Sequence, residues 1–144
     1  MTALTQRQAA PWLWILLGLF CLRVIAQPLS KTLQSPLLGE FDTWHSGVIA
    51  YPVLLMAQLA IVAGLSSLAL AFSRGAVIPN VSLGRWFFYV GVVYLCVMLV
   101  RLALGLTVLA GSPWFASPLP TIFHCVLACF LILVGRTHLS EATQ

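Results

Sequence analysis

Residues 86–110 read WFFYVGVVYLCVMLVRLALGLTVLA, with one charged residue, Arg101, and no proline. A continuous α-helix over this range is about 37 Å long, which is enough to cross a hydrocarbon core of about 30 Å. The stretch therefore predicts a transmembrane helix, and the remaining segments must be compatible with it.

Arg101 lies about 13 Å below the nearer end of this helix. An arginine near the bilayer centre costs at least about 2.5 kcal/mol on insertion scales, so it normally faces other helices, a ligand or a wet cavity. Gly91, Tyr94, Met98, Arg101 and Gly105 alternate in spacing between three and four residues and form one helical stripe. The small residue at each end of the stripe predicts close approach of a neighbouring helix.

The composition of the whole chain agrees with a membrane location. Of 144 residues, 61% are hydrophobic and 7% are charged, whereas a soluble domain carries about 25% charged residues. The net charge of +4 is scattered along the chain, so no clustered basic face is present and nucleic acid is excluded as a partner. The chain is predicted to be an all-α integral membrane protein with a single domain over residues 1–144.

The cysteines do not indicate a redox or zinc centre. All of them lie inside apolar segments, and none belongs to a C-x-x-C pair: Cys21, Cys96, Cys125 and Cys129. Free cysteines in such places behave as small hydrophobic residues.

Four apolar segments predict a four-transmembrane-helix up-down bundle. The expected helices are residues 11–27, 47–72, 86–110 and 119–135, with loops at 28–46 and 111–118 on the outer side. Pro28, Pro36 and Gly39 are expected to end the first helix and keep the first loop non-helical.

The first segment also resembles a secretory signal peptide, with cleavage after Ala26 as the alternative to a retained helix. Arg23 inside the cleavage region and the paired tryptophans Trp12 and Trp14 favour a membrane anchor.

The basic residues predict the orientation. Arg7, Arg74, Arg85 and Arg136 fall on one side of the expected bundle, and Lys31 alone falls on the other. Because basic loops stay in the cytoplasm, both termini are expected to be cytoplasmic. A bacterial inner (cytoplasmic) membrane is the expected location.

The polar residues of the apolar segments gather in the outer half of this topology. They predict a pocket that is open to, or covered by, the first outer loop. Its expected ligand-binding residues are Arg23, Gln58, Arg101, His124 and His45, with Glu40 and Asp42 as ion-pair partners or a lid.

A binding role follows from the chemistry of this set. Arginines and histidines in a low-dielectric pocket favour an anion, since the Coulomb attraction is weakly screened there. A lipid headgroup, a quinone or a carboxylate fits, and the chain is expected to act as an accessory or complex-forming subunit. Its partners are then the lipid bilayer and a second membrane protein or a second copy. Structural readings stay open: Arg23 can snorkel to the headgroups, and Gln58 can bridge helices.

Two other function classes remain open. His45 and His124 on facing helices can hold a b-type haem. Asp42, His45 and His124, with or without Glu40, form a donor set for a metal-dependent enzyme. The chain carries no Walker, Rossmann, nucleophile-elbow or H-E-x-x-H pattern.

Overall fold

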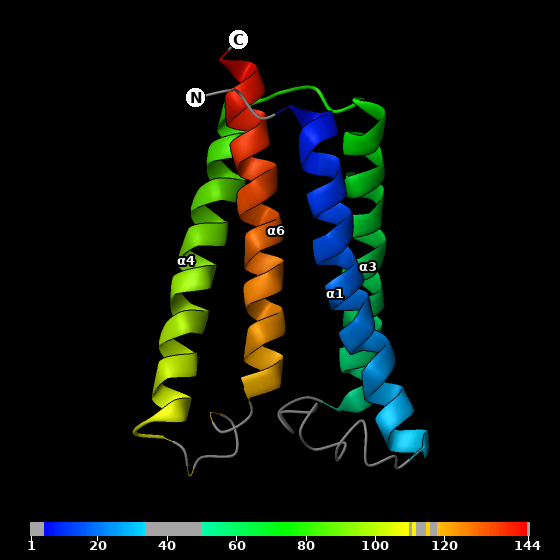
Figure 1. The fold of residues 1–144 in the computed structure, drawn as a ribbon, viewed down its shortest axis with the longest axis vertical. Helices are drawn as coiled ribbons and strands as arrows, with labels where there is room; N and C mark the ends of the chain where they lie inside the picture. The colour runs from blue at the N-terminus through cyan, green and yellow to red at the C-terminus, as the bar shows by residue number, and fades with distance from the viewer. Residues whose placement is uncertain (1–4, 34–49, 110, 112–114, 116–117, 144) are drawn as a thin grey trace.

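The computed structural model of the chain describes residues 5–33, 50–109, 111, 115 and 118–143. Within these residues there are helices and no strands. The helices are α1 (Gln6–Leu33), α3 (Tyr51–Arg74), α4 (Val81–Leu106) and α6 (Pro118–Ala142) (Figure 1). All four are long and apolar enough to cross a membrane. The expected all-helical class is therefore confirmed, and the helices indicate a membrane protein.

The expectation that Pro28 ends the first helix is wrong, because α1 continues through it to Leu33. A proline has no backbone donor for the carbonyl four residues earlier, here that of Val24, and membrane helices tolerate such an interruption. Beyond Pro28, the Ser30 hydroxyl donates to the Gln27 carbonyl at 2.9 Å and the Thr32 hydroxyl donates to the Pro28 carbonyl at 3.0 Å, so both hydroxyls bond within their own helix.

Local signals explain where α3 ends and where α4 begins. The backbone turns at Gly75 with φ +65°, a left-handed conformation that glycine adopts without strain. The N–H of Ala76 then donates to the Ala71 carbonyl at 3.0 Å and terminates α3. The Asn80 side chain accepts the Leu83 N–H at 3.0 Å, a cap that begins α4 before the predicted residue 86.

The helices lie in the spatial order α4, α6, α1, α3, and neighbours run in opposite directions (Figure 1). Helix α1 packs against α3 and α6, while α6 packs against α1 and α4. Helices α3 and α4 are consecutive in the chain but are not a packed pair. The start of α1 and the end of α6 lie at the same end of the molecule, which we call the terminal end.

Small residues bring α4 and α6 into close contact. A Cβ atom built on Gly91 would lie 2.8 Å from Cγ1 of Ile132, and one built on Gly135 would lie 2.8 Å from the Gly84 carbonyl oxygen. The close helix approach predicted at Gly91 is thus confirmed, with α6 as the neighbour. At Gly105 the neighbour is the carbonyl of Phe115.

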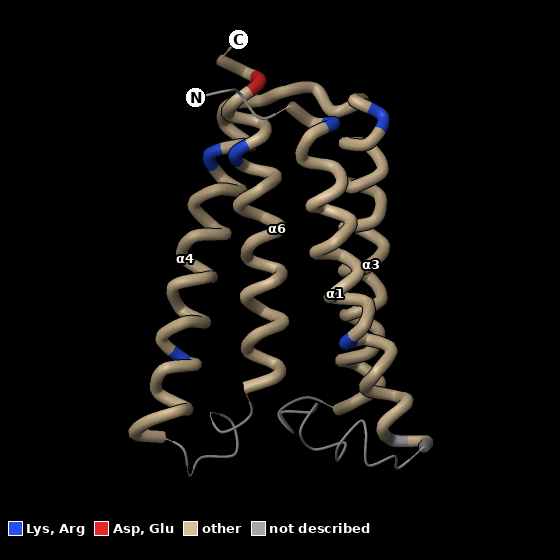
Figure 2. Tube along the Cα trace, in the orientation of Figure 1, with Lys and Arg blue, Asp and Glu red and all other residues tan. Residues whose placement is uncertain are grey.

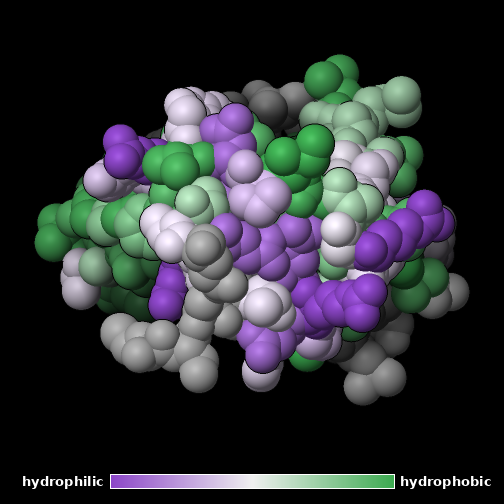
Figure 3. Space-filling view, turned by 90° about the horizontal axis from the view of Figure 1, so that it is seen from above, coloured by the Kyte–Doolittle hydropathy of each residue, from purple (hydrophilic) through white to green (hydrophobic). Residues whose placement is uncertain are grey.

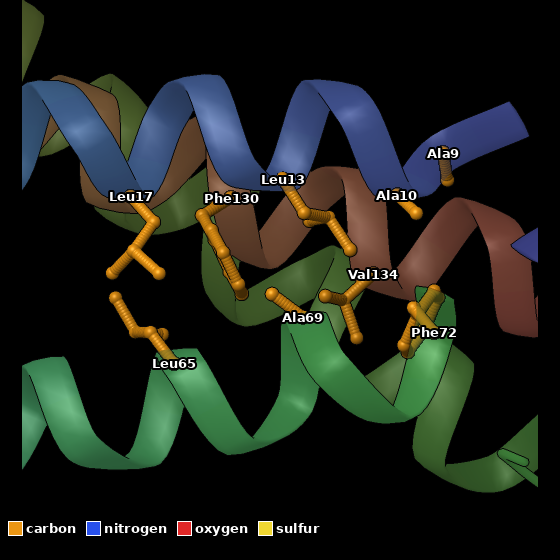
Figure 4. Packing of buried hydrophobic residues seen from close by; sticks show 9 residues of the cluster. All are labelled: Ala9, Ala10, Leu13, Leu17, Leu65, Ala69, Phe72, Phe130 and Val134. Atoms are coloured by element: carbon orange, nitrogen blue, oxygen red, sulfur yellow. The ribbon is translucent and has the colours of Figure 1, made fainter. Parts of the chain in front are cut away.

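Apolar packing joins α1, α3 and α6. Their buried side chains form one cluster (Figure 4), made of Ala9, Ala10, Leu13, Leu17, Leu65, Ala69, Phe72, Phe130 and Val134. Large apolar side chains also cover the outside of the helices, with Ile15, Met56 and Val93 among the exposed ones. An apolar exterior of this kind suits contact with lipid tails.

Polar side chains gather at the terminal end (Figure 3). Arg7, Arg74, Arg85 and Arg136 are exposed. Figure 2 shows basic positions near this end and, on α1 and α4, again in the opposite half. The basic positions in the opposite half are isolated within apolar helices, and they mark the candidate site.

Candidate functional site

A hydrogen bond between Tyr94 and His124 lies at the centre of the site. The Tyr94 hydroxyl is 2.7 Å from Nδ1 of His124, and the two rings meet edge to face with centroids 6.0 Å apart. Tyr94 follows Gly91 by three residues, so it lies on the face of α4 that packs against α6. The bond fixes the imidazole and leaves Nε2 as the ring nitrogen for another partner.

Arg23 enters the site from α1. Its side chain is only 4% exposed, and its Nε has no hydrogen-bond partner among the described residues. The guanidinium carbon instead lies 5.7 Å from the centre of the Phe123 ring, within the range of a cation–π contact. Arg23 thus faces α6, next to His124.

Arg101 brings a second positive charge to the same place. Arg101 follows Tyr94 by two helical turns, on the same face of α4. Along their helices, Arg23, Arg101 and His124 all lie about 26–30 Å from the terminal end. Residues of α1, α4 and α6 therefore meet at one depth, in the half of the molecule opposite the termini.

A pair of glutamines extends the polar region to α3. The Gln58 amide nitrogen donates to Oε1 of Gln27 at 3.3 Å, and the two residues are 2% and 0% exposed. Oε1 of Gln58 has no partner among the described residues. Gln27 follows Arg23 by one helical turn, so the two side chains lie on neighbouring positions of one helix face.

The structure brings together four of the predicted site residues: Arg23, Gln58, Arg101 and His124. It adds Tyr94, which the sequence indicated only as a member of the stripe on residues 91–105, and Gln27, which was not a predicted site residue. Both residues could have been found in the sequence, because each is a polar side chain one or two helical turns from an arginine on the same face. The other predicted residues, His45, Glu40 and Asp42, lie outside the described residues.

The metal and haem hypotheses also depend on residues outside the described ranges. Among the described residues, no group of three or more His, Cys, Asp or Glu side chains is placed to hold a metal ion. Asp42 and His45 are outside the described residues. Both belong to the expected metal set, and His45 is also one of the two expected haem ligands. Of the expected ligands, His124 alone is placed by the structure.

Sequence reasoning missed a buried histidine at the terminal end. His138 is 3% exposed, and its Nδ1 accepts the Asn80 N–H at 3.3 Å. Phe87 stacks on it with centroids 6.5 Å apart, and Phe72 meets it edge-on. The half of the molecule at the terminal end therefore also contains a buried polar side chain. The fourth helix was expected over residues 119–135, so His138 lay outside every predicted helix.

A hydrogen-bonded latch ties the chain together at this end. The Gln6 side chain donates to the Val77 carbonyl at 2.8 Å and accepts the Val77 N–H at 3.2 Å. Its side-chain and backbone nitrogens also donate to the Glu141 carboxylate, at 2.5 and 2.7 Å. The Glu141 charge is thus engaged far from Arg23 and Arg101.

Comparison with known proteins gives no match: no family model, no curated protein and no solved structure is similar to the chain. The candidate function therefore depends on the geometry of the site itself.

Proposed function

We propose that this membrane protein binds an anionic ligand in the pocket formed by Arg23, Arg101, His124 and Tyr94. The observation that carries the proposal is the burial of Arg23, whose Nε has no partner among the described residues. Arg101 lies at a similar depth, on the face of α4 that carries Tyr94. In a weakly polar setting an anion beside Arg23 is attracted more strongly than it is in water.

Each residue has a chemical role in this proposal. Arg23 and Arg101 supply charge and planar N–H donors, which suit carboxylate or phosphate oxygens. Tyr94 holds the His124 ring so that Nε2 can face the ligand. Gln27 and Gln58 form a polar wall on the α3 side. The apolar exterior of the helices supports a ligand that arrives through the membrane, such as a lipid or a quinone.

The orientation belongs to the same proposal. The exposed arginines of the terminal end favour the cytoplasm for both termini, so the pocket lies in the outer half of an up-down bundle. A bacterial inner membrane fits this arrangement. The protein then serves as an accessory subunit, with a membrane partner or a second copy completing the complex.

Native mass spectrometry of protein released gently from detergent tests the proposal. We expect a discrete adduct on the wild-type protein that is lost in Arg23→Met and Arg101→Met. Arg85→Met is the matched control, because Arg85 is exposed at the terminal end, and it should keep the adduct. The same adduct at unchanged occupancy in both pocket variants would overturn the proposal.

A second pair of variants separates ligand binding from internal ion pairing. If Glu40 and Asp42 neutralise the arginines, Glu40→Gln with Asp42→Asn lowers stability and leaves every adduct unchanged. If the pocket serves a ligand, the double variant keeps its stability and increases adduct occupancy, because two competing negative charges have been removed.

One observation favours b-type haem as the second candidate. Metal-bound histidines normally have a hydrogen-bond partner on the other ring nitrogen, and Tyr94 provides one at Nδ1 of His124. His124 and His45 would be the axial ligands. A Soret absorption band that disappears in His124→Ala supports this candidate, and a colourless protein excludes it. The same spectrum and a metal assay test the Asp42, His45 and His124 metal site.

A further inference from the structure

A buried hydrogen bond between α6 and the start of α4 depends on the charge state of His138. The His138 side chain is 3% exposed, and its Nδ1 accepts the backbone N–H of Asn80 at 3.3 Å. A neutral imidazole has one acceptor nitrogen, whereas a protonated imidazole donates from both nitrogens. Nδ1 is therefore unprotonated in this structure. A proton on Nδ1 would remove the acceptor and leave the Asn80 N–H facing another donor.

The groups packed around the ring favour the neutral imidazole. Phe87 of α4 stacks on the ring, and Phe72 of α3 meets it edge-on. A Cβ atom built on Gly84 would lie 2.9 Å from the His138 Cβ, so the backbone of α4 lies against the base of the side chain. None of these groups is titratable. Protonation of the enclosed ring would therefore bury a charge among apolar atoms, which costs free energy.

The charged groups at the terminal end do not offset that cost. Glu141 is the one acid among the described residues, and its carboxylate accepts both nitrogens of Gln6 from α1. Each helix also contributes one exposed arginine to this end: Arg7, Arg74, Arg85 and Arg136. The excess of positive charge disfavours a further proton on the enclosed ring.

The loop over residues 75–80, which joins α3 to α4, is tied to other helices by two sets of hydrogen bonds. Val77 bonds to the Gln6 side chain through its N–H and its carbonyl, and the Asn80 N–H bonds to His138. The Asn80 side chain also caps α4. Loss of the bond to His138 therefore frees the loop at the residue where α4 begins.

We infer that His138 is a pH-sensitive contact, in which a proton taken up from water at Nδ1 breaks the bond to Asn80 and releases the loop. A solvated imidazole gains its proton near pH 6.5. The closed loop, with a neutral ring, binds fewer protons than the released loop, so it is most stable above this pH and loses stability as the pH falls. Between pH 7.5 and pH 5, the equilibrium constant for release rises by up to about 30-fold. This inference is independent of the proposed anion site.

Amide exchange of Asn80 measures the release directly, because its N–H is the donor in the bond. NMR of the full chain in detergent micelles gives the exchange rate at pH 7.5 and at pH 5. Division by the rate of an unstructured peptide at the same pH gives a protection factor. We expect this factor to fall by about 10- to 30-fold at pH 5, while that of Phe130, in the buried core of α6, stays unchanged. A protection factor at Asn80 that does not change with pH would overturn the inference.

Variants identify the group that takes up the proton. His138→Asn places an amide oxygen near the position of Nδ1 and cannot titrate in this range. It should keep the protection at pH 7.5 and lose the pH dependence. Glu141→Gln is the matched control, because it removes the titratable carboxylate one turn away, and it should keep the ratio between the two pH values. A response that persists in His138→Asn or disappears in Glu141→Gln would contradict the role of His138. If His138→Asn does not fold, wild-type protein and Glu141→Gln still decide.

Discussion

The Tyr94 hydroxyl and Nδ1 of His124 lie 2.7 Å apart across the α4–α6 interface. This bond joins a helix that carries Arg101 to the helix whose Phe123 contacts Arg23. The geometry of the proposed site therefore depends on the packing of α4 against α6.

Tyr94→Phe should weaken the fold and alter the pocket. Loss of the hydroxyl leaves a half-buried imidazole nitrogen without its partner, at a cost of about 1–3 kcal/mol in the free energy of unfolding. Tyr89→Phe is the control, since Tyr89 is 64% exposed on the same helix. Thermal unfolding in detergent measures both. Equal unfolding temperatures for the two variants would show that the bond contributes nothing.

Gly135→Ala should separate α4 from α6. The added methyl would lie 2.5 Å from the Phe88 nitrogen and 2.8 Å from the Gly84 carbonyl oxygen, so backbone must move. We expect a loss of about 1–3 kcal/mol, typical of overpacking. Gly64→Ala, with no atom within 4 Å of its Cβ, should be neutral or gain up to about 1 kcal/mol from helix propensity. A neutral Gly135→Ala would contradict the observed interface.

Arg23→Met should stabilise the ligand-free protein while it removes ligand binding. The change replaces a buried charge with an apolar side chain of similar length, and insertion scales put an arginine in mid-membrane at about 2.5–3.5 kcal/mol. Chemical unfolding of delipidated protein provides the measurement. A clear loss of stability without ligand would instead make Arg23 a structural residue, held by Phe123 or by an acid of the chain.

Glu141→Ala should loosen the latch at the terminal end. The carboxylate accepts both nitrogens of Gln6, and loss of these charge-assisted bonds costs about 1.5–3 kcal/mol. Hydrogen exchange should rise in the first turn of α1 and around Val77. Thr143→Ala is the control, because among the described residues that exposed hydroxyl bonds the carbonyls of Leu139 and Ser140 at the same end of α6. Unchanged exchange in Glu141→Ala would rule out the latch as a source of stability.

The proposed orientation predicts which side of the membrane each helix end faces. In a variant without native cysteines, Thr143→Cys should react with a membrane-impermeant maleimide only from the cytoplasmic side. Thr107→Cys, at the other end of α4, should react only from the outside. Both positions are exposed. The reverse pattern would place the pocket in the inner half of the membrane.

The four helices were predictable because apolar length is a local property of the sequence. Their ends were harder to predict. Helix α1 continues beyond Pro28, where the Ser30 and Thr32 hydroxyls bond to its backbone. Helix α4 begins before residue 86 because Asn80 caps it. Hydropathy does not register individual hydrogen bonds of this kind.

The site was predictable in outline. Arg23, Arg101 and His124 share a depth in any antiparallel arrangement of their helices. Their neighbours could not be derived, because the order α4, α6, α1, α3 decides which faces meet. That order places Gln27 against Gln58 and Tyr94 against His124. It also buries His138, which lies beyond the predicted end of the fourth helix.

The same spatial order has a consequence for biogenesis. Helices α1 and α3 are synthesised before α6. Arg23 is therefore in the membrane before Phe123 and His124 of α6 can pack against it. The α1–α3 pair packs against the α4–α6 pair through α1 and α6 and through the apolar cluster that Phe72 of α3 joins. Chains stalled before α6 thus retain an uncovered arginine within the bilayer, a chemical mark by which membrane chaperones and proteases can distinguish unfinished molecules from finished ones.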